Sequence, residues 1–163
     1  MLKHVLSLIH TVRPSMVHGM IMARMSEIIP FNKLLGIELQ AVEDGVGRAF
    51  LPHREDLLNH IGTVHATAIY GLAEAASGCA MSGALAPMIA TIKPVAASAK
   101  IDYLKTAKTA LTAIGRTVEA PSTLRETLKR DRKARFNVQV EVADANHEQV
   151  ASIVVEWHVS LKA

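Results

Sequence analysis

The stretch LLNHIGTVHATAIYGLAEAASGCAMSGAL, residues 57–85, decides the fold that this sequence predicts. Between Val64 and Met81 nearly every residue is small or apolar, which predicts a helix that is apolar on almost all sides. Other elements must enclose a helix of this kind, because water would otherwise reach its apolar surface. A single carboxylate, Glu74, lies at its centre.

The segments around this helix alternate between apolar and polar residues, as strands with one buried face do. Residues 37–52 predict a hairpin, because the turn at 43–45 separates two such runs. Further strands are predicted at residues 96–105, 110–119, 134–144 and 149–161. An antiparallel sheet curled around the helix would cover it, so the predicted fold class is α+β.

Three shorter helical segments complete the predicted architecture. Residues 1–30 carry apolar side chains at helical spacing, and their methionines either cover an apolar pocket or pack on the side of the domain. A second helix ends at Gly36, and a third follows Pro121 with Thr123 and Glu126 as a capping box. We therefore expect one domain over residues 31–163, preceded by a helical segment over residues 1–30.

Composition limits the function. Of 163 residues 50% are hydrophobic and 20% are charged, which is typical of a globular domain. The net charge of +3 is too small to favour nucleic acid but suits a protein that handles small anions. Cys79 is the sole cysteine and the histidines lack metal-ligand spacing, so neither a disulfide nor a metal is expected. No run reaches the roughly 18 apolar residues of a membrane span, and we expect a cytoplasmic protein.

The acid shares one stripe of the predicted helix with small residues. At 100° per residue, this stripe carries Thr67, Gly71, Glu74, Gly78 and Met81. The glycines leave room beside the acid for a ligand or a second backbone. An exposed or ion-paired Glu74 is the ordinary alternative, but a carboxylate in apolar surroundings is a candidate general base or nucleophile.

The residues that precede the helix are polar and include Asn59, Gly62, Thr63 and His65. Thr63 is the predicted N-cap, and a local capping bond is also the more ordinary role for His65. The first turn of a helix presents unpaired N–H groups and a partial positive charge, which can stabilise the oxyanion that forms from a carbonyl.

His65 and Glu74 are too far apart to act together within one chain. Nine residues of helix separate them by about 13 Å and place them on opposite sides. They can meet only if a second copy of the helix lies antiparallel to the first, which a symmetric dimer provides.

These residues resemble the signature of hotdog-fold acyl-CoA thioesterases of the phenylacetate-pathway type. That signature reads Asn-x-x-Gly-x-x-His-Gly-Gly, followed eight or nine residues after the His by Asp or Glu. The segment NHIGTVHATAIYGLAEAASG, residues 59–78, follows this spacing, and KIDYLKTAK and the last two predicted strands are similar to later parts of the fold. The resemblance covers roughly Pro30 to the C-terminus and implies a hotdog fold, in which the sheet wraps one long central helix.

The resemblance also implies roles for individual residues. Glu74 matches the catalytic carboxylate, Asn59 the residue that orients nucleophile and water, and His65 the motif histidine. The N–H of Ala66 matches the amide that binds the thioester oxygen. The remaining residues of the motif are the expected substrate-binding set: Gly62, Thr63, Thr67, Ser77 and Gly78. A homodimer with shared sites, or a dimer of dimers, is implied as well.

The sequence departs from the signature at two places. Ala66 and Thr67 replace the two glycines after the histidine, and Gly78 occupies the position of a hydroxyl residue, with Ser77 rotated by about 100°. The leading expectation is hydrolysis of an acyl-CoA or acyl carrier protein thioester, with no cofactor beyond the coenzyme A of the substrate. A non-catalytic acyl-CoA-binding protein and a hotdog dehydratase are the alternatives, of which the motif spacing suits the dehydratase less well.

Overall fold

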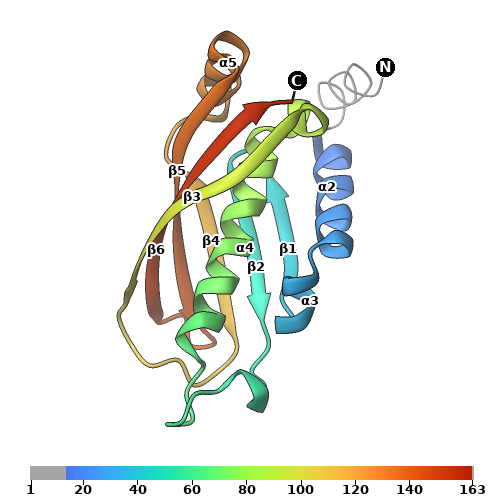
Figure 1. Cartoon of the computed structure of the whole chain (residues 1–163). Coiled ribbons are helices and arrows are strands. Elements are labelled where there is room, and N and C mark those ends of the chain that lie inside the picture. The colour runs from blue at the N-terminus through green and yellow to red at the C-terminus, as the bar shows by residue number, and fades with distance from the viewer. Residues whose placement is uncertain (1–13, 163) are drawn as a thin grey trace.

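A computed structural model describes residues 14–162 and contains one antiparallel sheet wrapped around a central helix (Figure 1). The strands are β1 (Glu38–Glu43), β2 (Val46–Leu51), β3 (Ile92–Tyr103), β4 (Leu111–Thr117), β5 (Lys133–Asp144) and β6 (Gln149–Leu161). They lie in the order β1-β2-β4-β5-β6-β3. The helices are α2 (Pro14–Ile28), α3 (Pro30–Leu35), α4 (Ala66–Ala84) and α5 (Pro121–Asp131), with the short 3-10 helices η1 (Glu55–Leu57) and η2 (Ala86–Thr91). The predicted α+β class and hotdog architecture are confirmed.

Helix α4 is the predicted apolar helix, and it runs through the curve of the sheet (Figure 1). It begins two residues later than predicted and continues three residues further, to Ala84. Its small residues allow the sheet to approach closely: a Cβ on Gly47 of β2 would overlap the backbone of Ala76 and Ala80. No helix within residues 14–162 has the length and apolar character needed to cross a membrane.

The strand pattern supplies the large side chains of the core. In β5 every second residue is buried, and in β6 the buried residues follow the same alternation, as predicted. These residues are Phe136, Val138, Val140, Val142, Ile153, Val155, Trp157 and Val159. Strand β3 differs, because residues 93–100 are exposed on both faces at the edge of the sheet. Its alternation therefore does not mark a buried face, in contrast to the sequence-based prediction.

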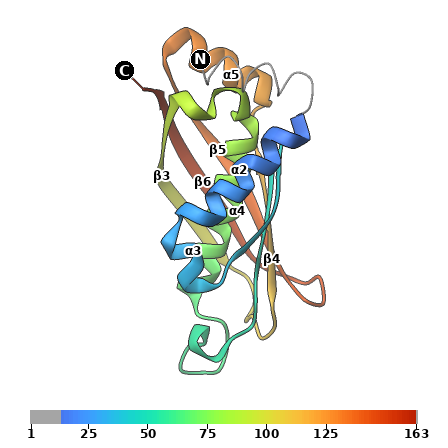
Figure 2. The same cartoon turned by 90° about the vertical axis from the view of Figure 1, so that its right-hand side faces the viewer.

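The N-terminal helices cover the side of α4 that the sheet leaves open (Figure 2). Val17 and Ile21 of α2 pack with Val42 of β1 and with Cys79 of α4. Helix α3 ends as predicted at Gly36, whose φ of 70° is left-handed. The part of the predicted first helix before Pro14 lies outside the described residues, and the domain boundary at residue 30 stays a prediction.

Helix α5 lies where it was predicted, but its capping box is wrong. The N-cap is Ala120, which has no side-chain acceptor, so Thr123 lies inside the helix rather than at its start. Leu124 and Leu128 are buried in the core. The guanidinium of Arg125 donates to the carbonyl oxygen of Ala84, the last residue of α4, at 2.7 Å, and therefore belongs to the C-terminal end of the central helix.

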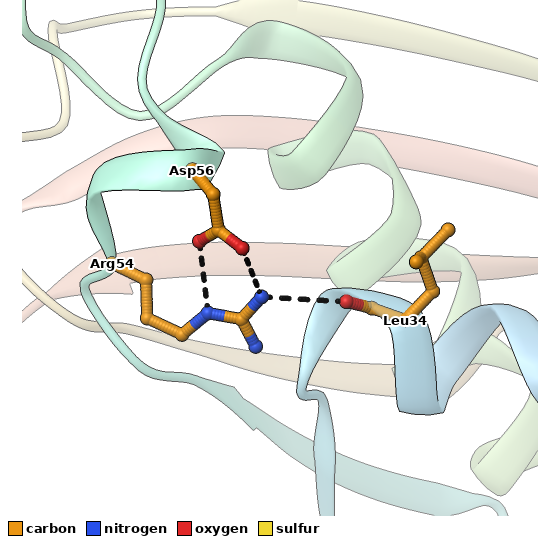
Figure 3. Close-up of polar contacts among 3 residues, drawn as sticks. All are labelled: Leu34, Arg54 and Asp56. Carbon is orange, nitrogen blue, oxygen red and sulfur yellow. Dashed lines mark hydrogen bonds and ion pairs between the residues drawn. The ribbon is translucent and has the colours of Figure 1, made fainter.

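A second arginine holds α3 in place (Figure 3). Arg54 donates to both carboxylate oxygens of Asp56, at 3.0 and 2.6 Å, and to the carbonyl oxygen of Leu34 at 3.4 Å. Asp56 belongs to η1, which precedes the start of α4, so this contact links the end of α3 to the chain that leads into the central helix.

The close approach of α4 to the sheet gives a stability prediction. A Cβ at Gly83 would overlap the carbonyl oxygen of Glu43, which is backbone and cannot turn away, whereas a Cβ at Gly19 of α2 meets nothing within 4 Å. We expect Gly83→Ala to lower the free energy of unfolding by about 1–3 kcal/mol, as overpacking does. Gly19→Ala should leave it unchanged or raise it by up to about 1 kcal/mol, because alanine favours a helix. Urea unfolding measures both, and equal stabilities of the two variants would contradict the packing described.

Candidate active site at Glu74

A large apolar cavity lies between α2, α4, η2 and the end of the sheet formed by β3 and β6. Its volume is about 800 Å³, within the range of small-molecule sites. Helix α4 contributes Glu74, Gly78 and Met81 to its wall, α2 contributes Met25, and β6 contributes Trp157. The stripe of α4 that carries the acid therefore borders a cavity, which the glycine at Gly78 helps to keep open.

Glu74 is half-buried in this wall, and its carboxylate has no hydrogen-bond donor or ion-pair partner among residues 14–162. Burial in apolar surroundings disfavours the charged form, so the pKa of the Glu74 carboxyl is raised. The ordinary alternative of an exposed or ion-paired glutamate does not describe this residue. A carboxyl with a raised pKa in the wall of a cavity is a candidate general acid or base.

Cys79 also lies near the acid, but burial in apolar surroundings makes its thiol unreactive. It is fully buried in the core. Burial, with a smaller contribution from the charge of Glu74, raises the pKa of the Cys79 thiol to about 12. The thiolate is the nucleophilic form of cysteine, and at neutral pH almost none is present here.

Ser77 and Gly78 lie differently with respect to the cavity. The Ser77 hydroxyl donates to the carbonyl oxygen of Glu74 at 2.7 Å and accepts from the Trp157 indole N–H at 3.2 Å. Ser77 is fully buried and does not line the cavity, whereas Gly78 does. The hydroxyl next to the acid therefore holds Trp157 against α4, and its role as a substrate-binding residue stays a prediction.

The loop before α4 is built around Asn59. Its side-chain oxygen accepts from the N–H groups of Ile61 and Thr63, both at 3.1 Å, and its side-chain nitrogen donates to the Thr63 hydroxyl at 2.8 Å. Gly62 has a φ of 73°, a left-handed conformation that glycine adopts without strain. Asn59 and Gly62 thus shape a fixed loop, and both lie at the start of the helix.

His65, not Thr63, is the N-cap of α4, which corrects the sequence-based assignment. Its Nδ1 accepts from the Thr67 N–H at 3.1 Å, so the neutral ring carries its proton on Nε2. Thr63 lies two residues before this N-cap, and its hydroxyl accepts from the Asn59 side chain within the loop. The capping bond also occupies the Thr67 N–H, so this amide is not available to a substrate.

The N–H of Ala66 remains available. Ala66 is exposed, is the first residue of α4, and its N–H has no acceptor within the described part of the chain. Its carbonyl oxygen accepts from the hydroxyl of Tyr103 at 3.0 Å, which fixes the helix start to the end of β3. One N–H at the positive end of a long helix is a suitable donor to an oxyanion.

The structure places the predicted site residues in two groups. Glu74 and Gly78 border the cavity, whereas the loop and helix-start residues lie about two turns earlier on α4. The residues from 59 to 67 do not line the cavity that contains Glu74. Helix α4 is continuous between the groups, so one chain does not bring them together.

Sequence reasoning missed two residues of this wall. Neither Trp157 nor Ser82 is among the predicted site residues, although both line the cavity. Ser82 lies eight residues after Glu74, close to the same face of a helix, and this spacing is the signal that would have found it. Within residues 14–162 no group of three His, Cys, Asp or Glu side chains is placed to hold a metal ion.

Comparisons with known structures agree with this fold. The PaaI protein of the Escherichia coli phenylacetic acid degradation operon is 19% identical, with a TM-score of 0.68 over 83% of this chain and 88% of that one. The probable thioesterase PA5026 of Pseudomonas aeruginosa is 22% identical, with a TM-score of 0.69 over 82% and 89%. A PaaI variant from Thermus thermophilus is 22% identical, with a TM-score of 0.64 over 80% and 98%.

At these identities the likeness shows the fold alone. Comparison with curated proteins found no match. The model of one family, described as a domain of unknown function (DUF4442), matches residues 18–159, which include the whole of α4 and all six strands up to Val159. The chain therefore belongs to the DUF4442 family and has the hotdog fold of the PaaI-type thioesterases.

Proposed function

We propose that the protein hydrolyses an acyl-CoA or acyl carrier protein thioester, with Glu74 as the catalytic carboxylate. The observation that carries this proposal is a half-buried carboxyl with a raised pKa and no ionic partner, in the wall of an apolar cavity of about 800 Å³. The apolar wall suits an acyl group. An acyl group bound there would place its thioester carbonyl close to the Glu74 carboxylate.

The chemistry requires one base and one oxyanion donor. As general base, Glu74 takes a proton from water while the water oxygen adds to the thioester carbonyl carbon. The tetrahedral intermediate then expels the thiol, which takes up the proton that Glu74 received. As nucleophile, Glu74 would attack the carbonyl itself, the C–S bond would break, and the released thiolate would take a proton from water. A second water would hydrolyse the resulting anhydride to the free acid and the Glu74 carboxylate. In both routes negative charge develops on the carbonyl oxygen.

The Ala66 N–H of a second copy would stabilise that charge. It is exposed, lacks an acceptor within the described residues and lies at the positive end of α4. Asn59 and His65 hold the loop and the cap around it, so we assign them the role of positioning this amide. The two groups of residues would meet only if two α4 helices lie antiparallel.

The edge of the sheet offers a surface for this second copy. Within the described residues strand β3 pairs only with β6, and its residues 93–100 are exposed and mostly small. An exposed edge strand presents unpaired N–H and C=O groups, which a symmetry-related strand can satisfy. We propose a homodimer, or a dimer of dimers, that forms along β3.

A non-catalytic acyl-CoA-binding protein is the second candidate. The Asn59 amide and the His65 Nδ1 are both occupied by hydrogen bonds within their own loop. These groups are therefore not free to orient a water molecule for hydrolysis, which favours binding without catalysis. Tight binding of acyl-CoA thioesters without release of thiol from any of them would favour this candidate.

Replacement of Glu74 by glutamine tests the catalytic role. Glu74→Gln should abolish thiol release from acyl-CoA in a spectrophotometric assay, because glutamine cannot accept the proton. The same variant should be more stable than wild type at neutral pH. A raised folded-state pKa means that the wild type loses stability as the pH rises from the unfolded value of about 4.3 through the folded value.

The pH dependence of stability shows whether Glu74→Gln loses activity through its chemistry or through a failure to fold. Urea unfolding from about pH 4 to pH 8 should show equal stabilities of Glu74→Gln and wild type at the acidic end, and a growing advantage of the variant above it. Unchanged thiol release in the variant would contradict the mechanism. A variant that is less stable at neutral pH would contradict the unpaired burial of the acid.

Replacement of Ala66 by proline tests the oxyanion donor. Proline lacks an N–H but is favoured at the first position of a helix, and the extended conformation of His65 (φ −62°, ψ 137°) suits a residue before proline. Ala66→Pro should therefore fold normally and lose kcat by about a hundredfold or more, as the loss of one oxyanion-hole donor does. Ala66→Gly keeps the N–H and serves as the matched control, with activity near that of the wild type.

A mixture of the two inactive variants tests whether the site is shared. A heterodimer of Glu74→Gln and Ala66→Pro subunits contains one site with an intact acid and an intact amide. Random exchange of subunits should therefore restore about a quarter of the wild-type activity. If thiol release stays absent after exchange has been demonstrated by mass spectrometry, the two groups do not act across an interface.

A further inference from the structure

One face of α2 forms a long wall of the Glu74 cavity. Its apolar residues follow helical spacing, so that they lie in a row along the helix. These residues are Val17, Met20, Ile21, Met25 and Ile28. The row extends from Val17 to Ile28, or about 16 Å of helix. Methionine adapts its shape to the group it contacts, so the middle of this wall can follow a flexible ligand.

Part of this wall is apolar surface that nothing in the described part of the chain covers. Met20 is 55% exposed, Ile28 50% and Val95 of the neighbouring β3 50%, although all three side chains border the cavity. Val17 and Ile21, by contrast, are buried against the sheet and α4. The helix is therefore anchored by one edge of its apolar face and presents the other edge to an apolar ligand.

Both cations that line the cavity within residues 14–162 have partners of their own. Arg24 forms an ion pair with Glu27 at 2.6 Å, and Lys162 donates to the carbonyl oxygen of Ala90 at 3.1 Å. Glu74 is the acid that borders the cavity. This wall therefore offers an acyl group apolar contact along α2 and one reactive carboxyl on α4.

Gly78 leaves space beside the acid, because it has no side chain. A Cβ on Gly78 would lie 3.7 Å from the Met25 Cε and 3.8 Å from the Trp157 Cζ2, which is ordinary contact. Gly78 follows Glu74 by one turn of α4, so Met25 and Trp157 line the cavity close to the acid.

We infer that the cavity binds a long, unbranched aliphatic acyl chain and that α2 sets the accepted length, with Met20 as a specificity-determining residue. This inference rests on the proposed thioesterase function and names its substrate class. The chain would enter beside Glu74, pass Gly78 and lie along the apolar row of α2. A short or aromatic acyl group would leave Met20 and Ile28 uncovered.

The test compares Met20→Trp with Met16→Trp. Met16 lies one turn earlier on the same helix and is similarly exposed, at 46%, but does not line the cavity. Wild type should hydrolyse palmitoyl-CoA with a higher kcat/KM than hexanoyl-CoA or phenylacetyl-CoA. Met20→Trp should lower kcat/KM for palmitoyl-CoA at least about tenfold and leave hexanoyl-CoA nearly unchanged. Met16→Trp should change neither, and Ile28→Trp is a second blocking variant if Met20→Trp does not fold.

Binding to the Glu74→Gln protein gives a readout that does not depend on turnover. Titration calorimetry should show tighter binding of palmitoyl-CoA than of hexanoyl-CoA, and Met20→Trp added to this background should remove the difference. If the wild type hydrolyses no thioester but this chain-length dependence is present, the proposed hydrolysis fails and the inference about the ligand holds.

Two results would overturn the inference while hydrolysis stands. The first is a preference of the wild type for hexanoyl-CoA or phenylacetyl-CoA that Met20→Trp does not alter. The second is an effect of Met20→Trp on the dimer dissociation constant, measured by sedimentation, together with binding that is independent of chain length. In the second case the exposed row of α2 contacts another copy of the chain and not an acyl group.

Discussion

The contact between α4 and the concave face of the sheet requires small residues, and the rest of the structure depends on it. Gly47 faces the backbone of Ala76 and Ala80, and Gly83 lies directly against the carbonyl of Glu43. Backbones this close leave no space for large side chains at these contacts, so the strands supply many of the large side chains of the core, as the buried rows of β5 and β6 do. Another face of the helix borders the cavity.

That other face is where an unpaired acid can persist. A carboxylate packed against the sheet would lose its hydration without compensation, which is strongly unfavourable. On the cavity side Glu74 is only half-buried, so the penalty is expressed as a raised pKa and not as a failure to fold. The same penalty makes the acid a better base near neutral pH than an exposed glutamate would be. The burial that makes the Glu74 carboxylate more basic therefore also lowers the stability of the fold, a trade-off that is common at active sites.

Features that depend on local sequence could be predicted, and those that depend on tertiary contacts could not. The apolar length of α4, the alternation in β5 and β6 and the left-handed Gly36 are local, and the structure confirms them. Threonine caps helices well, and the sequence therefore predicts Thr63 as the N-cap. The helix begins only at Ala66, so His65 is the N-cap, and the Thr63 hydroxyl bonds to Asn59 within the loop. The cavity itself depends on where α2 crosses α4, which no local pattern specifies.

The position of Tyr103 connects the edge of the sheet to the start of the helix. Its hydroxyl bonds to the carbonyl of Ala66, so the last residue of β3 fixes the first residue of α4. Because β3 is also an edge strand of the sheet, a second copy that paired along it would set the position of its own helix start relative to the cavity of its partner. The Ala66 N–H and the Glu74 carboxyl, which one chain holds about two turns apart, would then be oriented by the same strand that brings two chains together.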